Sequence, residues 1–249
     1  MQKKLYNMKA LILAAGKGTR LKELTADKPK ALVKVNGVTL LERCINKLKE
    51  AQADDIIINI HHFGEQIMEY VEKNGNFGIS ITYSDERDML LDTGGALKKA
   101  AWFFNNEQAF FIHNVDIISD INLQEMYQFH CSHGNMATLA VRSRNTSRYL
   151  LFNAQNRLCG RSNAQTNTTQ LISNQLNTND LLPMAFSGIH VISPQIFQYC
   201  PPEDKFSITD WYLQLASQHK IMAYEHNQGL WMDMGKAEDI HQLEQLLIQ

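Results

Sequence analysis

Cysteine, net charge and long apolar runs are all scarce in this sequence. Of its 249 residues only four are cysteines, the formal net charge is −2, and no apolar run approaches the length of a membrane span. The cysteines lie far apart and form no C-x-x-C pair, which is typical of a cytoplasmic protein with reduced thiols. They are Cys44, Cys131, Cys159 and Cys200.

The balanced charge leaves no electrostatic footprint for nucleic acid, so any phosphate binding must be confined to a local site. The first eight residues lack the hydrophobic segment of a signal peptide. Because Met8 directly precedes the first expected strand, residues 1–7 are predicted to be a loose extension. We therefore expect a soluble cytoplasmic protein with neither a nucleic acid nor a membrane as partner. The oligomeric state does not follow from the sequence.

The first 120 residues alternate apolar runs of strand length with segments of helical periodicity. Strands are expected at 10–13, 56–60, 79–83 and 109–112, and helices at 40–48, 67–71 and 94–104. This alternation predicts an α/β fold with a Rossmann-like, doubly wound sheet that is mixed and mostly parallel. Ligands bind to such sheets at the carboxyl ends of the strands.

The second half of the chain is less regular. Strands are expected at 137–141, 149–152 and 184–192, and helices at 208–216 and 236–248. Residues 154–180 are crowded with Asn, Gln, Thr and Ser, which predicts either a solvated hairpin extension or a flap over a substrate. Neither an internal repeat nor a linker is visible, so residues 1–249 are expected to form a single domain.

The most informative segment is the glycine-bearing turn at 14–20, AAGKGTR, which follows the first apolar strand. Gly16 and Gly18 let the backbone come close to phosphate oxygens and point N–H groups at them. Arg20, and Lys30 in the K-P-K segment ten residues later, supply positive charge. The segment therefore predicts a polyphosphate site.

Two common glycine-loop motifs do not fit this turn. The P-loop pattern G-x-x-x-x-G-K-[ST] has no match in the chain. The dinucleotide fingerprint G-x-G-x-x-G fails at Leu21, which stands where its third glycine would pack a helix against a strand. A third pattern, L-A-A/G-G-x-G-T-R-L followed by K-P-K, is matched almost completely by residues 13–21 and 28–30.

On these residues the chain resembles the sugar-1-phosphate nucleotidyltransferase family, whose members join a nucleoside triphosphate to a sugar phosphate. Further similar segments follow in the family's order: D-T-G-G at 92–95, N-V-D at 114–116, F-S-G-I at 186–189 and G-L-W-M-D-M-G at 229–235. The chain looks closest to the N-acetylmuramate-1-phosphate uridylyltransferase and mannose-1-phosphate guanylyltransferase-like members. The resemblance implies a nucleotide-binding half, 1–120, and a sugar-phosphate-binding half, 121–249.

The reaction that the resemblance implies is attack by a sugar-1-phosphate oxygen on the α-phosphorus of the triphosphate, with release of pyrophosphate. Arg20 and Lys30 would be the catalytic residues, and Asp116 and Asp233 would bind Mg²⁺. The implied nucleotide contacts are Ala14, Ala15, Gly16, Gly18, Thr19, Thr93 and Gly94, and the implied sugar contacts are Asn114, Gly188 and Asp210.

Several of these residues also have a purely structural interpretation. Asp92 or Thr93 could cap the helix that follows, and Asp116 could cap a helix or close a turn. Asp210 could equally cap the helix at 208–216. The pairs His61-His62 and His130-x-x-His133 are better explained as polar loop or helix-face histidines than as a transition-metal site, because no carboxylate stands at ligand spacing.

The chain departs from the family pattern where many relatives carry the sugar-contacting segment E-K-P. Here residues 160–163 read G-R-S-N and lead into the polar tract, so the sugar stays open, as does the base. One rival enzyme is a cytidylyltransferase that acts on phosphocholine or a related phospho-alcohol. A non-catalytic rival is a regulatory domain that binds nucleotide without turnover.

Overall fold

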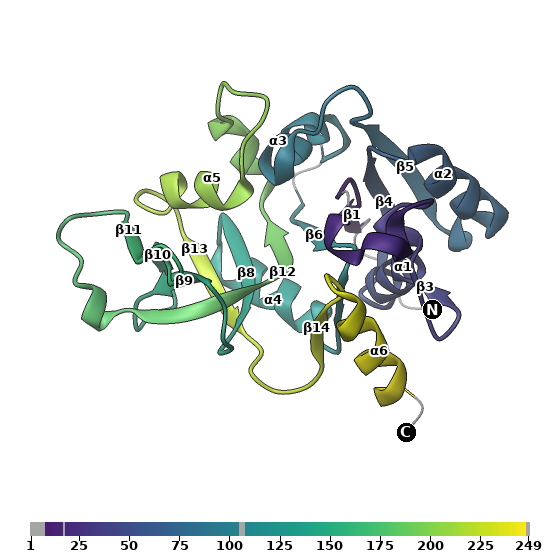
Figure 1. Ribbon diagram of the computed structural model, residues 1–249. Helices are drawn as coiled ribbons and strands as arrows, with labels where there is room; N and C mark the ends of the chain where they lie inside the picture. Colours follow the sequence, from purple (N-terminus) through teal and green to yellow (C-terminus); the bar gives the residue numbers. More distant parts are fainter. Residues whose placement is uncertain (1–7, 17, 105–107, 248–249) are drawn as a thin grey trace.

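A computed structural model describes residues 8–16, 18–104 and 108–247 (Figure 1). The loose extension predicted for residues 1–7 lies outside these ranges. Within them, ten strands form one sheet with the order β11-β10-β9-β12-β6-β1-β4-β5, and β8 and β13 continue from β12 on a branch. The strands are β1 (Met8–Leu13), β4 (Ala53–Ile60), β5 (Ser80–Asp85), β6 (Phe110–Asn114), β8 (Ala137–Arg142), β9 (Arg148–Phe152), β10 (Leu158–Asn163), β11 (Thr168–Leu171), β12 (Leu182–Ile192) and β13 (Ile221–Glu225).

The N-terminal half of the sheet is parallel, as the alternating pattern predicts. β1 pairs in parallel with β4 and with β6, and β4 pairs in parallel with β5. Their carboxyl ends therefore meet at one edge, where the glycine-bearing turn follows β1. The other half is mainly antiparallel, because β12 runs against β6, β8 and β9. The predicted α/β fold with a mixed sheet is confirmed.

Helices cover both faces of this sheet. Ala10 and Ile12 of β1 belong to one apolar cluster, with α1, α2 and α4, whereas Leu11 belongs to a second cluster with α3 and α5. Alternate side chains of a strand point to opposite faces, so the continuous apolar run of β1 is buried on both sides. The helices are α1 (Leu40–Glu50), α2 (Gly64–Lys73), α3 (Asp92–Lys99), α4 (Leu123–His133), α5 (Ile208–Leu215) and α6 (Ala237–Leu246). No helix in the described part is both long and apolar enough to span a membrane.

Two small antiparallel sheets lie outside the main one. β2 (Lys34–Val35) pairs with β3 (Val38–Thr39), and β7 (Ile117–Ser119) pairs with β14 (Trp231–Asp233). α6 packs Ile240 and Leu243 onto a third apolar cluster that includes residues of the first of these sheets. The β7–β14 sheet matters for the site, because it joins the segment after β6 to the C-terminal part of the chain.

Within the polar tract at 154–180, residues 158–171 form a β-hairpin. β10 and β11 pair in antiparallel fashion and end the sheet on the side opposite β5 (Figure 1). The expected hairpin is observed, and a role of the tract over a substrate stays a prediction. The sheet runs without a break through both halves of the chain. That residues 1–120 bind the nucleotide and residues 121–249 bind the sugar phosphate stays a prediction.

The predicted helix at 94–104 is wrong in both bounds. α3 begins at Asp92 and ends at Lys99, and a separate 3-10 turn, Ala101–Phe104, follows. The chain turns there because Phe103 and Phe104 are buried in the second apolar cluster, which a continued helix would not allow. The other 3-10 segments are Thr19–Thr25, Lys30–Leu32, Gly75–Gly78, Thr178–Asp180 and Pro194–Tyr199.

His130 is also not the polar helix-face residue that its spacing predicts. It is buried under α4, where Nδ1 contacts the Thr138 hydroxyl at 2.9 Å and Nε2 contacts the Ser193 hydroxyl at 3.0 Å. The two hydroxyl groups satisfy both ring nitrogens of His130, which explains why a histidine is tolerated in this core position.

Candidate active site

The glycine-bearing turn after β1 is held from below by Asn59. The Asn59 Oδ1 accepts hydrogen bonds from the amides of Ala14 at 2.6 Å and Ala15 at 3.2 Å. Gly18 adopts a left-handed φ of 63° and precedes the 3-10 segment that carries Thr19 and Arg20. A Cβ at Gly18 would lie 3.1 Å from Cβ of Lys30, so this glycine also brings the turn close to the K-P-K segment.

Asn59 is itself fixed by a buried acid. Its Nδ2 donates to Glu86 Oε1 at 2.8 Å, and Glu86 Oε2 accepts the Leu91 amide at 3.1 Å. Burial raises the pKa of Glu86. Sequence reasoning missed both residues, although Asn59 is the one polar side chain in the run Ile56–Ile60 and could have been noticed for that reason.

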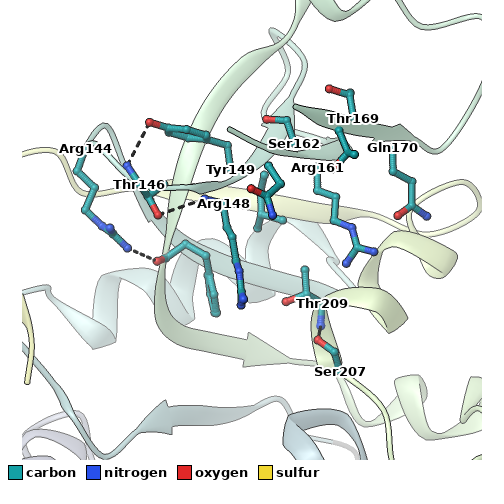
Figure 2. Close-up of a pocket in the computed structure, with 14 residues that line it drawn as sticks. Arg144, Thr146, Arg148, Tyr149, Arg161, Ser162, Thr169, Gln170, Ser207 and Thr209 are labelled. Atoms are coloured by element: carbon teal, nitrogen blue, oxygen red, sulfur yellow. Dashed lines mark hydrogen bonds between the residues drawn. The ribbon is translucent and has the colours of Figure 1, made fainter. Parts of the chain in front are cut away.

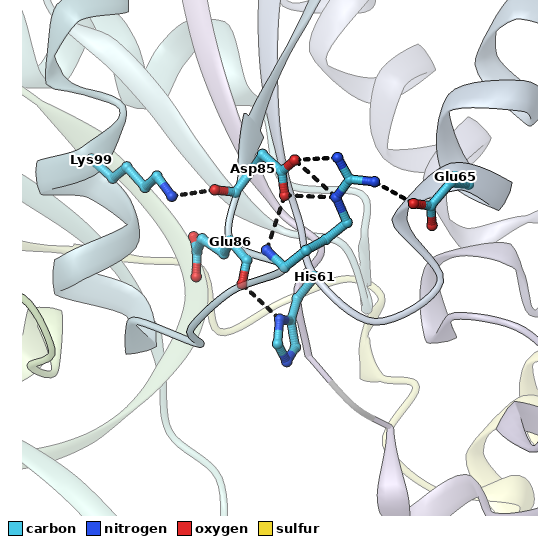
Figure 3. A network of polar contacts seen from close by, with 6 residues as sticks. His61, Glu65, Asp85, Glu86 and Lys99 are labelled. Carbon is cyan, nitrogen blue, oxygen red and sulfur yellow. Dashed lines mark hydrogen bonds and ion pairs between the residues drawn. The ribbon is translucent and has the colours of Figure 1, made fainter.

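The loop after β5 is braced on two sides (Figure 3). Arg87 Nε donates to Asp85 Oδ2 at 2.8 Å, and its guanidinium also pairs with Glu65 on α2. Lys99 at the end of α3 donates to the Asp85 carbonyl, and His61 Nδ1 lies 2.7 Å from the Glu86 carbonyl oxygen. These contacts hold the Glu86 segment against the carboxyl ends of β4 and β5.

Lys30 lies between the two carboxylates that the sequence assigns to a metal. Its side chain is 6% exposed, its Nζ pairs with Asp116, and it lies 4.0 Å from Asp233 Oδ1. The β7–β14 pairing brings Asp116 and Asp233 together, and the Met234 amide donates to the Asp116 carbonyl at 2.8 Å. Of the two lysines in the K-P-K segment, Lys30 points inward, whereas Lys28 is half-exposed beside Asp27.

Arg20 lies against Gly235, close to Asp233. A Cβ at Gly235 would approach Arg20 Nη2 to 2.8 Å and Asp233 Oδ1 to 3.0 Å, so the glycine makes room for both side chains. Arg144 is also near: its guanidinium lies 4.2 Å above the Trp231 ring, and it lines the same small cavity as Arg20 and Asp233. Three cations, Arg20, Lys30 and Arg144, therefore surround two carboxylates.

Asp116 and Asp233 form a donor set that fits Mg²⁺. Asp233 Oδ1 is a buried oxygen with no hydrogen-bond partner, and burial together with the neighbouring Asp116 raises the pKa of Asp233. A divalent cation would satisfy this oxygen and stabilise the charged form. Two carboxylates with the remaining positions left to phosphate oxygens and water are what magnesium prefers. Among the described residues no cluster of three or more His, Cys, Asp or Glu side chains could hold a metal by itself.

A cavity of about 340 Å³ opens beside this cluster at the carboxyl ends of β1, β4, β5 and β6. Ten of its lining residues are polar or belong to the glycine-bearing turn: Ala15, Gly16, Lys30, Asn59, Glu86, Asp92, Thr93, Asn114, Asp116 and Lys205. Ala14, Gly18, Thr19 and Gly94 do not line it. The cavity thus brings together part of the site predicted from sequence, and Arg20 and Asp233 line a neighbouring cavity.

Thr93 and Gly94 are committed to contacts within the protein. The Thr93 hydroxyl accepts the Ile208 amide at 3.0 Å, so Thr93 caps α5 and not α3. Asp92 Oδ1 accepts the Thr93 amide at 2.6 Å in the first turn of α3, as expected of a capping residue. The Gly94 amide donates to the Phe206 carbonyl at 2.9 Å, and a Cβ there would lie 2.3 Å from the Phe206 ring. The glycines of this motif serve close packing of α3 on the Phe206 segment.

Of the three predicted sugar contacts, two lie together and one lies apart. Gly188, with φ of 76°, leaves room for Asn114, whose Nδ2 would be 2.9 Å from a Cβ at that position. Asp210 lies on α5 and pairs with Arg161 of β10. It accepts no capping hydrogen bond, because the Ser207 hydroxyl takes the Thr209 amide instead. Asp210 therefore belongs to the neighbourhood of a second cavity.

The second cavity, of about 640 Å³, lies between the β10–β11 hairpin and the beginning of α5 (Figure 2). Three arginines line it, Arg144, Arg148 and Arg161, and sequence reasoning missed all three as site residues. The only signal was the replacement of E-K-P by a segment containing Arg161. Arg144 also lines the cavity of Arg20 and Asp233, so it joins the two regions.

The fold and the site define an α/β protein with a paired-carboxylate centre beside a glycine-bearing turn, and comparison with known proteins gives its family. Residues 9–249 match the model of the Nucleotidyl transferase family, and the chain belongs to that family. It is 28% identical over 237 residues to mannose-1-phosphate guanyltransferase beta-B of Xenopus laevis, covering 93% of this chain and 62% of that protein.

A second relative matches over most of both lengths. The chain is 28% identical over 236 residues to the N-acetylmuramate alpha-1-phosphate uridylyltransferase of Caulobacter vibrioides, covering 91% of each. The fold is also that of UDP-glucose pyrophosphorylase solved with UDP-glucose, with a TM-score of 0.77, 16% identity and coverage of 98% of this chain and 99% of that one. The chain thus spans about three fifths of the guanylyltransferase relatives' length.

Proposed function

We propose that this protein transfers a nucleotidyl group from a nucleoside triphosphate to a sugar 1-phosphate, giving a nucleoside diphosphate sugar and pyrophosphate in a Mg²⁺-dependent reaction. The observation that carries the proposal is that Arg20, Lys30, Asp116 and Asp233 lie together, and that Lys30 and Asp116 line the cavity beside the glycine-bearing turn. The relatives named for mannose 1-phosphate and N-acetylmuramate 1-phosphate act on acceptors of this class.

In the proposed reaction a phosphate oxygen of the acceptor forms a bond to the α-phosphorus, and the bond from that phosphorus to the oxygen bridging the α- and β-phosphates breaks. Pyrophosphate leaves with the electron pair of the broken bond. The protein need supply no nucleophile, so its task is to align two anions and to offset their charge. Mg²⁺ held by Asp116 and Asp233 would neutralise charge on the phosphate oxygens.

The side chains around the cavity divide this task. Gly16, Gly18 and Thr19 would hold the triphosphate, and Arg20 would bind the departing pyrophosphate. Lys30, fixed by Asp116, would contact the phosphate between the two reactants. The Thr93 side of the cavity would face the base, and Asn114 with Gly188 would face the sugar.

The site of action proposed for this reaction is the cytoplasm, where nucleoside triphosphates are abundant. The four cysteines, Cys44, Cys131, Cys159 and Cys200, are all free thiols, as expected for a reducing compartment.

The test is a matrix of the four common nucleoside triphosphates against sugar 1-phosphates and phosphocholine, with Mg²⁺ present and pyrophosphate release as the readout. We expect release only when a triphosphate and a sugar 1-phosphate are both supplied, and none after chelation of the metal. Turnover with phosphocholine alone would identify the rival cytidylyltransferase. Tight nucleotide binding without turnover for any pair would identify a regulatory domain.

A further inference from the structure

We propose that the arginine-lined cavity between the β10–β11 hairpin and α5 binds a second anionic group of the acceptor, so that the preferred substrate is a sugar 1-phosphate that also carries a carboxylate. This inference rests on the proposed function and names the acceptor class within it. The cavity is named here the acceptor cavity, lined by Arg144, Arg148, Arg161 and the hydroxyl and amide side chains around them.

The charged side chains that line the acceptor cavity are all cationic. Its lining holds three guanidinium groups and no carboxylate, and most of its other side chains are hydroxyls and amides. Hydroxyls and amides suit a polyhydroxylated ligand, since each can donate and accept hydrogen bonds. Guanidinium groups bind carboxylates and phosphates through paired hydrogen bonds, which a neutral sugar does not offer.

Arg144 is placed for the phosphate that reacts. It packs over the Trp231 ring, donates to the Phe186 carbonyl at 3.1 Å and lines the cavity that holds Arg20 and Asp233. Because Lys30 and Arg20 also lie near Asp233, three cations are already available to the reacting phosphates. The two remaining arginines lie further from the carboxylate centre, among the hairpin strands.

Arg148 and Arg161 face the same space. They project from β9 and β10 toward Thr209 at the start of α5 (Figure 2). Arg161 pairs with Asp210, whereas no carboxylate among the described residues lies within 4.0 Å of the Arg148 guanidinium. Two like charges that face one cavity repel each other, and an anion placed between them offsets that repulsion. Arg148 is therefore the cation that a second anion would satisfy.

The position of the acceptor cavity also sets the geometry of the ligand. Because Arg144 lines both cavities, a ligand that fills the acceptor cavity reaches the Asp233 region with one end only. The 1-phosphate would lie at that end, and the carboxylate at the far end near Arg148. A neutral hexose 1-phosphate would leave Arg148 without a partner.

The experiment compares N-acetylmuramate 1-phosphate with N-acetylglucosamine 1-phosphate, which differ only by the ether-linked group that carries the carboxylate. We expect the wild-type protein to prefer the acidic acceptor in kcat/KM by roughly 10- to 100-fold, the range for a hydrogen-bonded charged group. Arg148→Ala should remove most of this preference through a higher KM for the acidic acceptor. The neutral acceptor should change by less than about twofold.

Arg157→Ala is the matched control, because Arg157 lies beside β10 but outside the lining of the acceptor cavity. It should leave the values for both acceptors as in the wild type. Arg148→Gln, which keeps the length of the side chain, should behave as Arg148→Ala does, and the thermal midpoints of all variants should match the wild type.

Three results would overturn the inference: equal use of the two acceptors, equal losses with both acceptors in Arg148→Ala, or a preference for a sugar 1,6-bisphosphate over the acidic sugar. If no triphosphate supports turnover, the proposed function fails, and calorimetric titration of the same two acceptors still decides the inference. Tighter binding of the acidic acceptor by about tenfold or more would support it; equal binding would contradict it.

Discussion

Lys30 has two kinds of neighbour, and its setting explains how one lysine serves both stability and chemistry. Buried beside Asp116 and near Asp233, it offsets the repulsion of two carboxylates before any ligand binds. In the proposed reaction, a divalent cation would give the carboxylates a new partner, and the lysine could then turn its charge toward phosphate. A buried lysine with two acidic neighbours is therefore placed for exchange of partners, which an exposed residue such as Lys28 is not.

The first prediction concerns the carboxylates themselves. Asp116→Asn and Asp233→Asn should each abolish Mg²⁺-dependent release of pyrophosphate while the protein stays folded, since the amide keeps the shape of the side chain but loses its charge. The measurement is pyrophosphate release across a Mg²⁺ titration. Asp180→Asn, on an exposed 3-10 segment, is the control and should not change the rate. Near-wild-type rates in either variant would exclude that residue as a metal ligand.

A second prediction at this scale concerns Arg20. Arg20→Ala should lower the rate by about 10² or more, because it removes a charge held in place at the site where pyrophosphate leaves. Single-turnover kinetics with saturating triphosphate would measure the loss. A loss confined to KM would assign Arg20 to binding alone.

At the scale of elements, the D-T-G-G segment shows that one motif can have a packing role and still border a ligand cavity. Thr93 lines the cavity beside the glycine-bearing turn and at the same time caps α5. Gly94 and Gly95 let α3 approach the segment that precedes α5. The two helices lie on the same face of the sheet, and their contact links the cavity beside the glycine-bearing turn to the acceptor cavity. The glycines are thus explained by close approach, without any ligand.

The prediction for this contact is that Gly95→Ala destabilises the fold. A Cβ at Gly95 would lie 2.1 Å from the Asp204 carbonyl oxygen, so the backbone must shift, at a cost of about 1–3 kcal/mol in the free energy of unfolding. This exceeds the roughly 1 kcal/mol that alanine contributes over glycine in a helix. Urea unfolding would measure the change.

Gly64→Ala is the matched control for that measurement. Gly64 also lies in a helix, α2, but its nearest neighbours are the side-chain atoms of Ile60, at 3.1 Å or more, which can move. This variant should be neutral or slightly stabilising. If both variants were equally stable, the close approach of α3 to the Asp204 segment would not explain the glycine.

For the whole molecule, buried histidines tie stability to pH. Burial lowers the pKa of His113 and of His130 to about 4, and that of His190 to about 3. His113 and His190 lie on the adjacent strands β6 and β12, and all three are neutral in the folded protein at pH 7. The unfolded chain, with ordinary histidine pKa values near 6.5, binds more protons below that pH.

Stability should therefore fall as the pH drops from about 6.5 toward 4, with a slope of up to about 1.4 kcal/mol per pH unit for each such histidine. His130→Gln should make this fall shallower between pH 6.5 and 5, where most carboxylates are still ionised. Urea unfolding at a series of pH values gives the slopes. The exposed His241→Gln should keep the wild-type slope, and an unchanged slope in His130→Gln would contradict the assignment.

Much of this protein could be read from local patterns, and the failures have a physical reason. The parallel strands and the glycine-bearing turn were predictable because side-chain periodicity and a left-handed φ are demands of a few neighbouring residues. Lys30, Asp116 and Asp233 were found through short motifs. Glu86, Arg144 and Arg148 were not, because in the sequence they do not differ from ordinary polar residues, and Asn59 was missed although it interrupts an apolar run. The end of α3 was misjudged because Phe103 and Phe104 are drawn into a core that only the folded sheet creates.

The sequence by itself determined the α/β class, the glycine-bearing turn and the identities of the charged residues at the centre, since each depends on a few neighbouring positions. Only the tertiary structure decided which of these meet. The pairing of β7 with β14 brings Asp233 to Asp116 and Lys30, and the β10–β11 hairpin carries Arg161 to the start of α5. Such distances depend on strand order and register across the whole sheet, which no local pattern encodes.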